Sequence, residues 1–214
     1  GKGKGEPLVK ARIAVLVSGG GTNLQALLDA QHAGKLPSGE IVLVVSNVAG
    51  AYALERAKKA GVPGCTLLKK ALGSQEAFEA ALLRTLQENR IDVIILAGFL
   101  NILSGNFTDR YPDRILNIHP SLIPSFCGAG FYGLKVHEAA LAYGVKVTGA
   151  TVHFVNSVPD GGRIIAQKAV DIFPGDTPES LQRRVMEQAE WVLLPQAAEQ
   201  VCRELINKTS EGDQ

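Results

Sequence analysis

Four short apolar segments in the first half of the chain are typical of buried β-strands. They are rich in Val, Ile and Leu and lie at residues 12–18, 40–46, 65–68 and 91–97. Strands that are apolar on both faces favour a parallel sheet covered on both sides. The segments between them carry leucine or alanine at helical spacing and predict helices over residues 22–32, 51–60 and 74–89. This alternation of strand and helix indicates an α/β domain.

The second half of the chain predicts a different arrangement. Residues 115–119 are typical of a further strand, and a loop rich in proline and glycine separates it from a short helix expected over residues 136–143. Two extended segments, 145–155 and 163–172, flank the turn Pro159–Gly162. Because this turn is rich in turn-forming residues, the two segments can pair as a hairpin.

One long helix is expected to close the chain over residues 177–207. Thr177 is a suitable N-cap, Pro178 suits the first helical position, and Pro195 inside the helix predicts a kink. The elements together predict a single-domain, Rossmann-like α/β fold whose mostly parallel, twisted sheet is flanked by helices, with a C-terminal β-hairpin-like extension and a long C-terminal helix. We expect a domain over residues 12–207 with flexible tails at residues 1–11 and 208–214.

Composition narrows the classes of partner. The chain has 214 residues, and 22 Lys+Arg nearly balance 21 Asp+Glu, which argues against a dedicated nucleic-acid partner. No apolar run approaches the roughly 20 residues that cross a membrane, and the N-terminus lacks a hydrophobic signal core, so we expect a cytoplasmic protein. Cys65, Cys127 and Cys202 form no CxxC pair, so neither a disulfide framework nor a metal site is predicted. Small molecules are the expected partners.

A glycine loop, Ser18–Asn23, joins the first predicted strand to the first helix. Glycines let a phosphate approach the backbone N–H groups of a helix N-terminus. The third glycine of a dinucleotide fingerprint would fall at Leu24, and no Lys-Ser/Thr pair of a triphosphate loop is present. The loop therefore favours a monophosphate, with a tight turn that binds nothing as the alternative. The candidate phosphate ligands are Gly20, Gly21, Thr22 and Asn23.

A second candidate site lies at the end of the strand over residues 115–119. Asn117 and His119 are two residues apart, so they point to the same face of the strand at its carboxyl end, where open α/β sheets place ligands. An amide can donate to a developing oxyanion, and histidine exchanges protons near neutral pH. A carboxylate such as Asp160 would favour the charged ring. The alternatives are a structural histidine and a plain turn residue.

Three segments, taken in order, resemble the phosphoribosylglycinamide formyltransferases, a family of folate-dependent formyltransferases. They are SGGGTNL at Ser18–Leu24, LNIHPSLIPSF at Leu116–Phe126, and GATVHFV at Gly149–Val155 with the DGG turn that begins at Asp160. The resemblance extends from Arg12 to about Cys202. It implies transfer of a formyl group from 10-formyltetrahydrofolate to the amino group of 5-phosphoribosyl-glycinamide in purine biosynthesis, with no metal.

The resemblance also implies roles for particular residues. It makes Asn117, His119 and Asp160 catalytic and gives the Ile123–Pro124 peptide a cis bond. The implied substrate-binding residues are Gly20, Gly21, Thr22, Asn23, Pro120, Glu187 and Glu190. The implied cofactor-binding residues are Gln75, Leu100, Asn101, Ile102, Leu103 and Val155, with Asn117 and Asp160 shared.

Four features depart from the pattern of the family. Asn101 and Gln75 stand where many members carry a basic residue, and Glu187 replaces a basic or neutral one. The loop Cys127–Lys135 is longer than expected and is interpreted as a partly ordered flap or an insertion.

Three other functions remain open from the sequence, two of them within formyl chemistry. Methionyl-tRNA formyltransferase and formyltetrahydrofolate hydrolase have a similar core, but both are expected to need additional chain. A non-catalytic nucleotide-binding module would want an acidic residue near Asn47, which is absent. We expect a monomer or a homodimer.

Overall fold

Seven strands form one sheet in the computed structural model, which describes residues 9–212. Their order across the sheet is β3-β2-β1-β4-β5-β6-β7, and the first five are parallel while β6 and β7 pair antiparallel. The strands are β1 (Ala11–Val17), β2 (Gly39–Ser46), β3 (Gly64–Thr66), β4 (Val93–Leu96), β5 (Ile115–His119), β6 (Val147–Phe154) and β7 (Ile164–Asp171). The predicted mostly parallel α/β sheet with a hairpin extension is confirmed.

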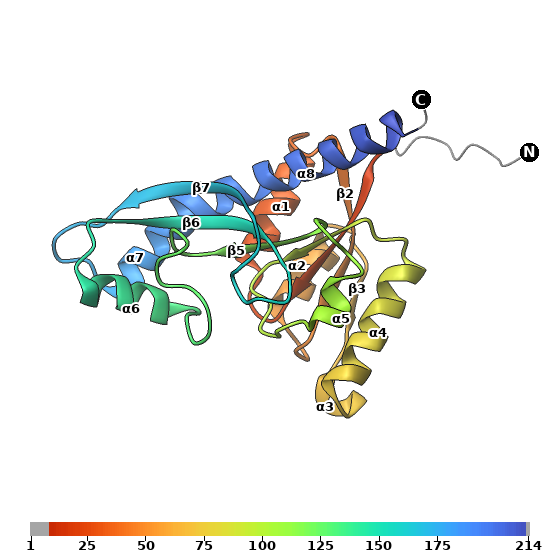
Figure 1. Ribbon diagram of the computed structural model, residues 1–214, viewed down its shortest axis with the longest axis horizontal. Coiled ribbons are helices and arrows are strands. Elements are labelled where there is room, and N and C mark those ends of the chain that lie inside the picture. The colour runs from red at the N-terminus through yellow and green to blue at the C-terminus, as the bar shows by residue number, and fades with distance from the viewer. Residues whose placement is uncertain (1–8, 213–214) are drawn as a thin grey trace, which may run out of the picture.

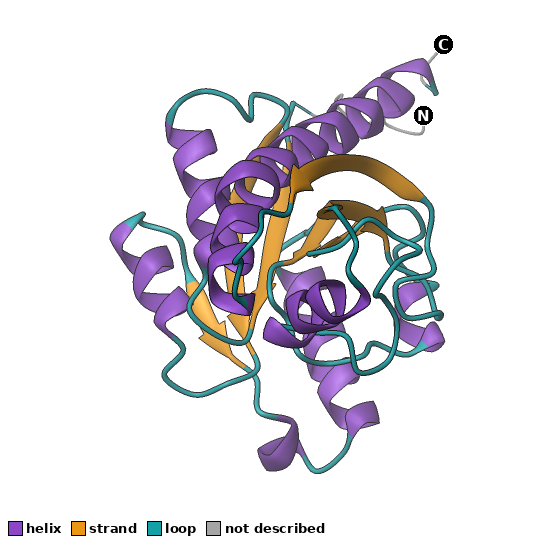
Figure 2. Ribbon diagram, turned by 90° about the vertical axis from the view of Figure 1, so that its left-hand side faces the viewer, coloured by secondary structure: helices purple, strands orange, loops and turns teal. Residues whose placement is uncertain are grey.

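Helices cover both faces of this sheet. They are α1 (Thr22–His32), α2 (Tyr52–Lys59), α3 (Lys69–Leu72), α4 (Gln75–Glu88), α5 (Gly105–Thr108), α6 (Leu134–Tyr143), α7 (Pro178–Val185) and α8 (Trp191–Glu211), with a π-helical turn at Met186–Glu190. Figure 1 shows β6 and β7 extending to one side of the parallel part, close to α6 and α7. Figure 2 shows α8 crossing one face of the sheet.

The side chains of β1 alternate between two hydrophobic cores, one on each face of the sheet. Ile13, Val15 and Val17 point into the cluster formed with α1, α2 and α8, whereas Ala14 and Leu16 point into the cluster formed with α4 and α5. All five side chains are completely buried. Because successive residues of a strand face opposite sides, a strand between two helical layers must be apolar at every position.

The short helices α3 and α5 are not predicted by the sequence. Each has four residues, too few to show a helical repeat. The expected strand over residues 91–97 is shorter than predicted, because the Ile91 N–H donates to the Leu86 carbonyl and closes helix α4 instead. Ser74 caps α4 as expected, since its side chain accepts the Ala77 N–H.

The predicted closing helix is divided into α7, the π-helical turn and α8. Thr177 caps α7 through a capping box with Ser180, and Pro178 lies in its first turn, both in line with the sequence. Pro195 lies inside α8, which continues through it to Glu211, beyond the predicted end at residue 207. The rest of the predicted tails, residues 1–8 and 213–214, lies outside the described residues. In the described part, no helix is both long and apolar enough to cross a lipid bilayer.

The topology brings several loops to one edge of the sheet. Strands β1, β4 and β5 are parallel neighbours, so their carboxyl ends lie at the same edge. These ends lead into the glycine loop, the segment after Leu96, and the segment after His119. Strand β6 runs antiparallel to β5 with Asn117 opposite His153. The sheet thereby places residues that are far apart in the sequence side by side.

Candidate active site

The structure brings together the three residues that the sequence singled out as catalytic. His119 Nδ1 lies 3.8 Å from Asp160 Oδ2, and Asn117 lies two residues before His119 on β5. A fourth residue, His153 of β6, joins them. Its Nε2 is 3.2 Å from Asn117 Nδ2 and 3.4 Å from Asp160 Oδ1. The sequence left His153 as a supporting or core residue, because the register of β6 against β5 is not readable from the chain alone.

The two histidines have defined hydrogen-bond roles. His119 Nε2 lies 2.8 Å from the carbonyl oxygen of Phe126, and a carbonyl can only accept, so this nitrogen carries a proton. His153 Nδ1 donates in the same way to the carbonyl of Phe154 at 2.8 Å. In the neutral His153 ring, Nε2 is therefore an acceptor for the Asn117 amide, and in the protonated ring it donates to Asp160. His119 keeps Nδ1 free to face Asp160.

Asp160 is held as an anion by its neighbours. Burial by itself raises the pKa of the carboxyl. The side-chain hydrogen bond with His153, the Gly128 N–H donated at 2.8 Å and the nearby His119 outweigh burial, so that the pKa is lowered overall. Asp160 has a positive φ of 52° within its turn. A Cβ on Gly162 would overlap the carbonyl oxygen of Phe154, so glycine is required there.

A third buried histidine lies close to this cluster. His137 of α6 is buried, and neither ring nitrogen has a hydrogen-bond partner in the described part of the chain. Burial, followed by the proximity of His119, lowers the pKa of His137 to about 4. The ring is therefore neutral near pH 7. No sequence signal separates it from an ordinary polar residue at the start of a helix.

The glycine loop forms the N-terminus of α1, as the sequence predicts. Gly21 is the N-cap, with a φ of +79°. A Cβ added to Gly21 would lie 2.6 Å from the Cβ of Ala53, so a side chain does not fit at this position. Asn23 in the first turn donates from Nδ2 to Glu190 Oε1 at 3.3 Å, so two predicted substrate-binding residues meet here. The Asn23 Oδ1 atom is buried with no partner among the described residues.

Glu190 lies in the π-helical turn and is almost completely buried. Burial raises the pKa of its carboxyl to about 7, and the hydrogen bond from Asn23 lowers it only in part. Glu187, in the same turn, is exposed and forms an ion pair with Arg183 at 2.7 Å. Of the two predicted acidic residues, only Glu190 is in contact with the glycine loop in this structure.

The segment predicted to bind the cofactor follows β4. Gln75 and Asn101 donate to each other's side-chain oxygens at 2.9 Å, so their amides form a reciprocal pair. Leu100 and Ile102 are exposed, whereas Leu103 is buried in the core beside α4. The side chain of Leu103 therefore packs in the core, and only the backbone of this residue could contact a ligand. Val155 also packs against this core.

Glu79 anchors this segment, a role that no sequence pattern indicates. It is a buried carboxylate on α4 that accepts from the backbone N–H and the hydroxyl of Ser104 and from Gln75. Burial raises the pKa of Glu79, but the hydrogen bonds from Ser104 and Gln75 lower it by more. In a sequence, an acidic residue in the first half of an amphipathic helix normally indicates a position exposed to solvent.

The loop after His119 is tied to the catalytic residues at two points. Phe126 supplies the carbonyl that binds His119, and Gly128 supplies the N–H that binds Asp160. The Ile123–Pro124 peptide is cis, as the resemblance implied. Pro120 is half-buried directly after His119. Whether residues 127–135 act as a flap stays a prediction.

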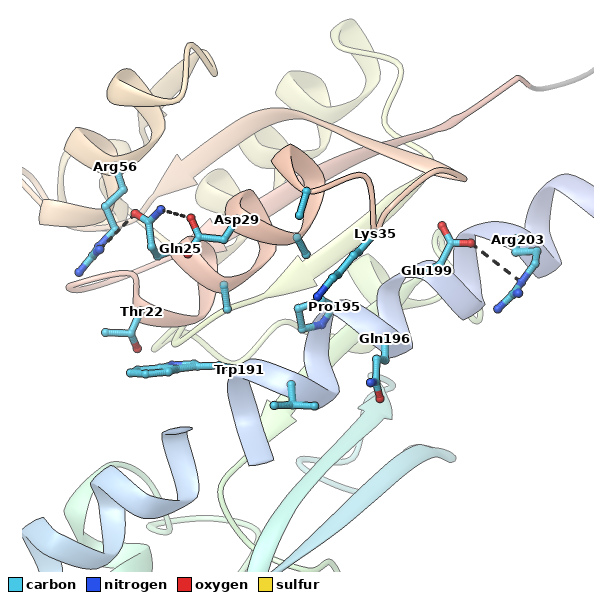
Figure 3. Close-up of a pocket in the computed structure, with 14 residues that line it drawn as sticks. Thr22, Gln25, Asp29, Lys35, Arg56, Trp191, Pro195, Gln196, Glu199 and Arg203 are labelled. Atoms are coloured by element: carbon cyan, nitrogen blue, oxygen red, sulfur yellow. Dashed lines mark hydrogen bonds and ion pairs between the residues drawn. The ribbon is translucent and has the colours of Figure 1, made fainter. Parts of the chain in front are cut away.

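A groove with a volume of about 740 Å³ lies between α1 and α8. In the view of Figure 3, Thr22 lies just above Trp191, and Arg56 lies beside Gln25. None of the three residues predicted to be catalytic lines it. The groove therefore borders the glycine loop and lies apart from the cluster of histidines.

Comparisons with known proteins agree on one family. A family model described as formyl transferase matches residues 11–197. Phosphoribosylglycinamide formyltransferase of Haemophilus influenzae is 44% identical over 184 residues, which are 86% of this chain and 84% of its own length. The trifunctional purine biosynthetic protein adenosine-3 of Gallus gallus is 47% identical over 205 residues, 95% of this chain but 20% of its own length. This chain thus spans a fifth of that trifunctional relative.

Solved structures show the same similarity. Glycinamide ribonucleotide transformylase 1 of Symbiobacterium toebii is 44% identical and superposes with a TM-score of 0.85 over 91% of this chain and 89% of its own. Phosphoribosylglycinamide formyltransferase of Brucella melitensis is 42% identical with a TM-score of 0.83, covering 90% of this chain and 96% of its own.

Proposed function

The chain belongs to the formyl transferase family, and from this premise we propose that it is a phosphoribosylglycinamide formyltransferase. The reaction is the transfer of the formyl group of 10-formyltetrahydrofolate to the amino group of 5-phosphoribosyl-glycinamide. The products are formylglycinamide ribonucleotide and tetrahydrofolate. The proposed place of the reaction is de novo purine biosynthesis, since relatives carry the names of enzymes of that process.

One observation carries the proposal. Asn117, His119 and Asp160 meet at the carboxyl end of β5, and the glycine loop leaves the carboxyl end of β1, with only β4 between the two strands. A phosphorylated amine bound at the loop would then reach towards the cluster. Acyl transfer needs a donor for the developing oxyanion and a group that moves a proton, and the cluster offers both.

The residues suit the steps of an acyl transfer. The substrate amine forms a bond to the formyl carbon, the bond from that carbon to the folate nitrogen breaks, and the amine proton ends on that nitrogen. The Asn117 amide has two N–H groups, and at most one of them is taken by His153, so one is available to the formyl oxygen. His119 is the proposed second donor to the formyl oxygen, and the anionic Asp160, 3.8 Å from its Nδ1, is the proposed partner in moving the amine proton to the folate nitrogen.

The remaining predicted residues have proposed roles in binding. Gly20, Gly21, Thr22 and Asn23 hold the substrate phosphate, and Glu190 with Pro120 borders the rest of that substrate. The segment from Leu100 to Leu103, with Gln75 and Val155, borders the folate. The structure offers support for Glu190 through its contact with Asn23, and none for Glu187, which is paired with Arg183.

A direct formyl-transfer assay tests the proposal. The wild-type chain is given 10-formyltetrahydrofolate with glycinamide ribonucleotide, methionyl-tRNA or water as acceptor, and we expect turnover with the nucleotide. Because loss of one oxyanion donor costs about 10²–10³ in rate, we expect His119→Ala to lose at least that factor in kcat, with a smaller change in KM. Preference for another acceptor, or near-normal kcat in His119→Ala, contradicts the proposal.

Three accompanying expectations stay predictions. They are a cytoplasmic location, a monomer or homodimer, and a reaction that uses no metal.

A further inference from the structure

Helix α2 binds the glycine loop from behind. The Ala53 N–H donates to the carbonyl of Gly19 at 3.1 Å. One turn later, Arg56 Nε donates to the carbonyl of Gly20 at 2.7 Å. Two successive carbonyls of the loop are therefore fixed by one helix.

This arrangement determines where the loop's N–H groups point. A trans peptide directs its C=O and the following N–H to opposite sides, and both loop peptides are trans. With the carbonyls of Gly19 and Gly20 turned towards α2, the N–H groups of Gly20 and Gly21 point away from it. Neither N–H has a hydrogen-bond partner among residues 9–212. They lie beside the first-turn N–H groups of α1, which no intrahelical acceptor satisfies.

Arg56 is itself held by more than one element. Its Nη1 donates to Gln25 Oε1 of α1 at 3.2 Å, and its guanidinium lies 4.9 Å from the centre of the Tyr52 ring. Figure 3 shows Arg56 reaching towards Gln25. A planar guanidinium can bond the loop carbonyl and Gln25 at once, which a lysine ammonium on a single stem cannot reproduce with the same geometry.

We propose that Arg56 is a positioning residue for the substrate phosphate, because its bond to the Gly20 carbonyl aims the Gly21 N–H at the phosphate. The inference rests on the proposed function, which supplies a phosphorylated substrate. No sequence motif singled out this residue. Its effect passes through the peptide between Gly20 and Gly21.

Steady-state kinetics of three variants test the role. Arg56→Met removes the bond, and Arg56→Lys keeps the charge but not the planar fork. Lys59→Met is the matched control, since Lys59 lies on the same helix and near the same Tyr52 ring but bonds no loop atom. A hydrogen bond to a charged group accounts for about a ten- to hundredfold change in affinity.

We expect Arg56→Met to raise KM for glycinamide ribonucleotide about ten- to hundredfold. The kcat and the KM for the formyl donor should stay within about twofold, as should every constant of Lys59→Met. Arg56→Lys should resemble Arg56→Met, and full recovery by lysine would show that charge, rather than geometry, is responsible. Glycinamide riboside, which lacks the phosphate, should lose nothing in Arg56→Met, and an equal loss with both substrates also overturns the proposal.

Titration of the ¹⁵N-labelled chain with inorganic phosphate separates this inference from the proposed function. We expect phosphate to shift the Gly20 and Gly21 amide signals in the wild type and in Lys59→Met, and much less in Arg56→Met. If these shifts occur but the wild type does not formylate the nucleotide, only the proposed function fails. If the wild type is active and these amides do not respond, the role of Arg56 is wrong.

Discussion

At the scale of single residues, burial and neighbours from other elements set the charge of the acidic groups in the site. Asp160 is an anion because His153 and the Gly128 N–H bind it. Glu190 lies in the opposite situation, since burial raises the pKa of its carboxyl to about 7 and no cation offsets this. The buried carboxylate of Glu190 is suited to binding the amine of the proposed substrate, and it lowers the stability of the protein when no ligand is bound.

Replacing Glu190 by glutamine should therefore stabilise the chain while weakening substrate binding. The folded pKa of about 7 lies above the ordinary carboxyl value of 4.5, so stability from this group is fully present below pH 4.5 and is lost as pH rises through 7. We expect Glu190→Gln to raise the free energy of unfolding at pH 8 by up to about 3 kcal/mol, with little difference at pH 4.5.

Urea unfolding at both pH values checks this expectation. The control is Glu187→Gln, which removes an exposed ion pair and should change the free energy of unfolding by less than about 1 kcal/mol. KM for the glycinamide substrate should rise in Glu190→Gln. If Glu190→Gln is instead less stable than the wild type at pH 8, the fold stabilises the ionised carboxylate of Glu190, and the prediction is wrong.

At the scale of elements, turns and strand ends hold the groups proposed to be catalytic. The turn after β6 carries Asp160 and is closed against β6, because the Phe154 N–H donates to the Arg163 carbonyl. Gly162 lies against the carbonyl of Phe154, with no room for a Cβ. The conformation of this turn is thus tied to the strand that carries His153.

Substitution of Gly162 by alanine should shift this turn and move the Asp160 carboxylate away from His119. We expect a loss of about 2–4 kcal/mol in the free energy of unfolding, because a Cβ would overlap backbone atoms that cannot move alone. The kcat should fall in the folded fraction as well. Gly212→Ala is the control, since a Cβ there meets its nearest atom at 3.5 Å. Thermal unfolding and the formyl-transfer assay on both variants measure these two losses. A normal kcat in Gly162→Ala would contradict the predicted displacement of Asp160.

Elements with a clear repeat were predictable, and the others were not. The strands β1, β2 and β5 and the helices α1 and α4 follow from apolar patterns, and Asn117 and His119 from their spacing on one strand. The pairing of Asn117 with His153 depends on the register of β6, which packing across the sheet decides. Glu79, Arg56 and His137 look like ordinary surface residues until the fold surrounds them.

At the scale of the whole molecule, stability should depend on pH through His137. Its pKa of about 4 in the folded chain lies below the ordinary histidine value of 6.5, because burial disfavours the charged ring. Protonation then favours the unfolded chain, so this contribution is complete above pH 6.5 and declines as pH falls towards 4, by at most about 1.4 kcal/mol per pH unit.

Urea unfolding between pH 7 and pH 4.5 should show this slope. We expect His137→Leu to be flatter than the wild type over this range, whereas His32→Gln, at an exposed position on α1, should keep the wild-type slope. The comparison must be between variants, since Glu190 changes stability in the opposite direction over part of the range. Equal slopes in His137→Leu and the wild type would show that the ring is not the group responsible.

The π-helical turn between α7 and α8 has a consequence for how the chain can vary in length. A π turn closes i→i+5 hydrogen bonds and holds one residue more than an α-helical turn. Deleting one residue from Met186–Glu190 would leave an ordinary α-helical turn, and α7 and α8 would keep about the same relative orientation, because the π turn fits its extra residue into one turn. The tightened turn would nevertheless move the backbone that carries Glu190, whose side chain bonds Asn23. The helix backbone accepts such a deletion, but the position of the acidic side chain at the glycine loop does not.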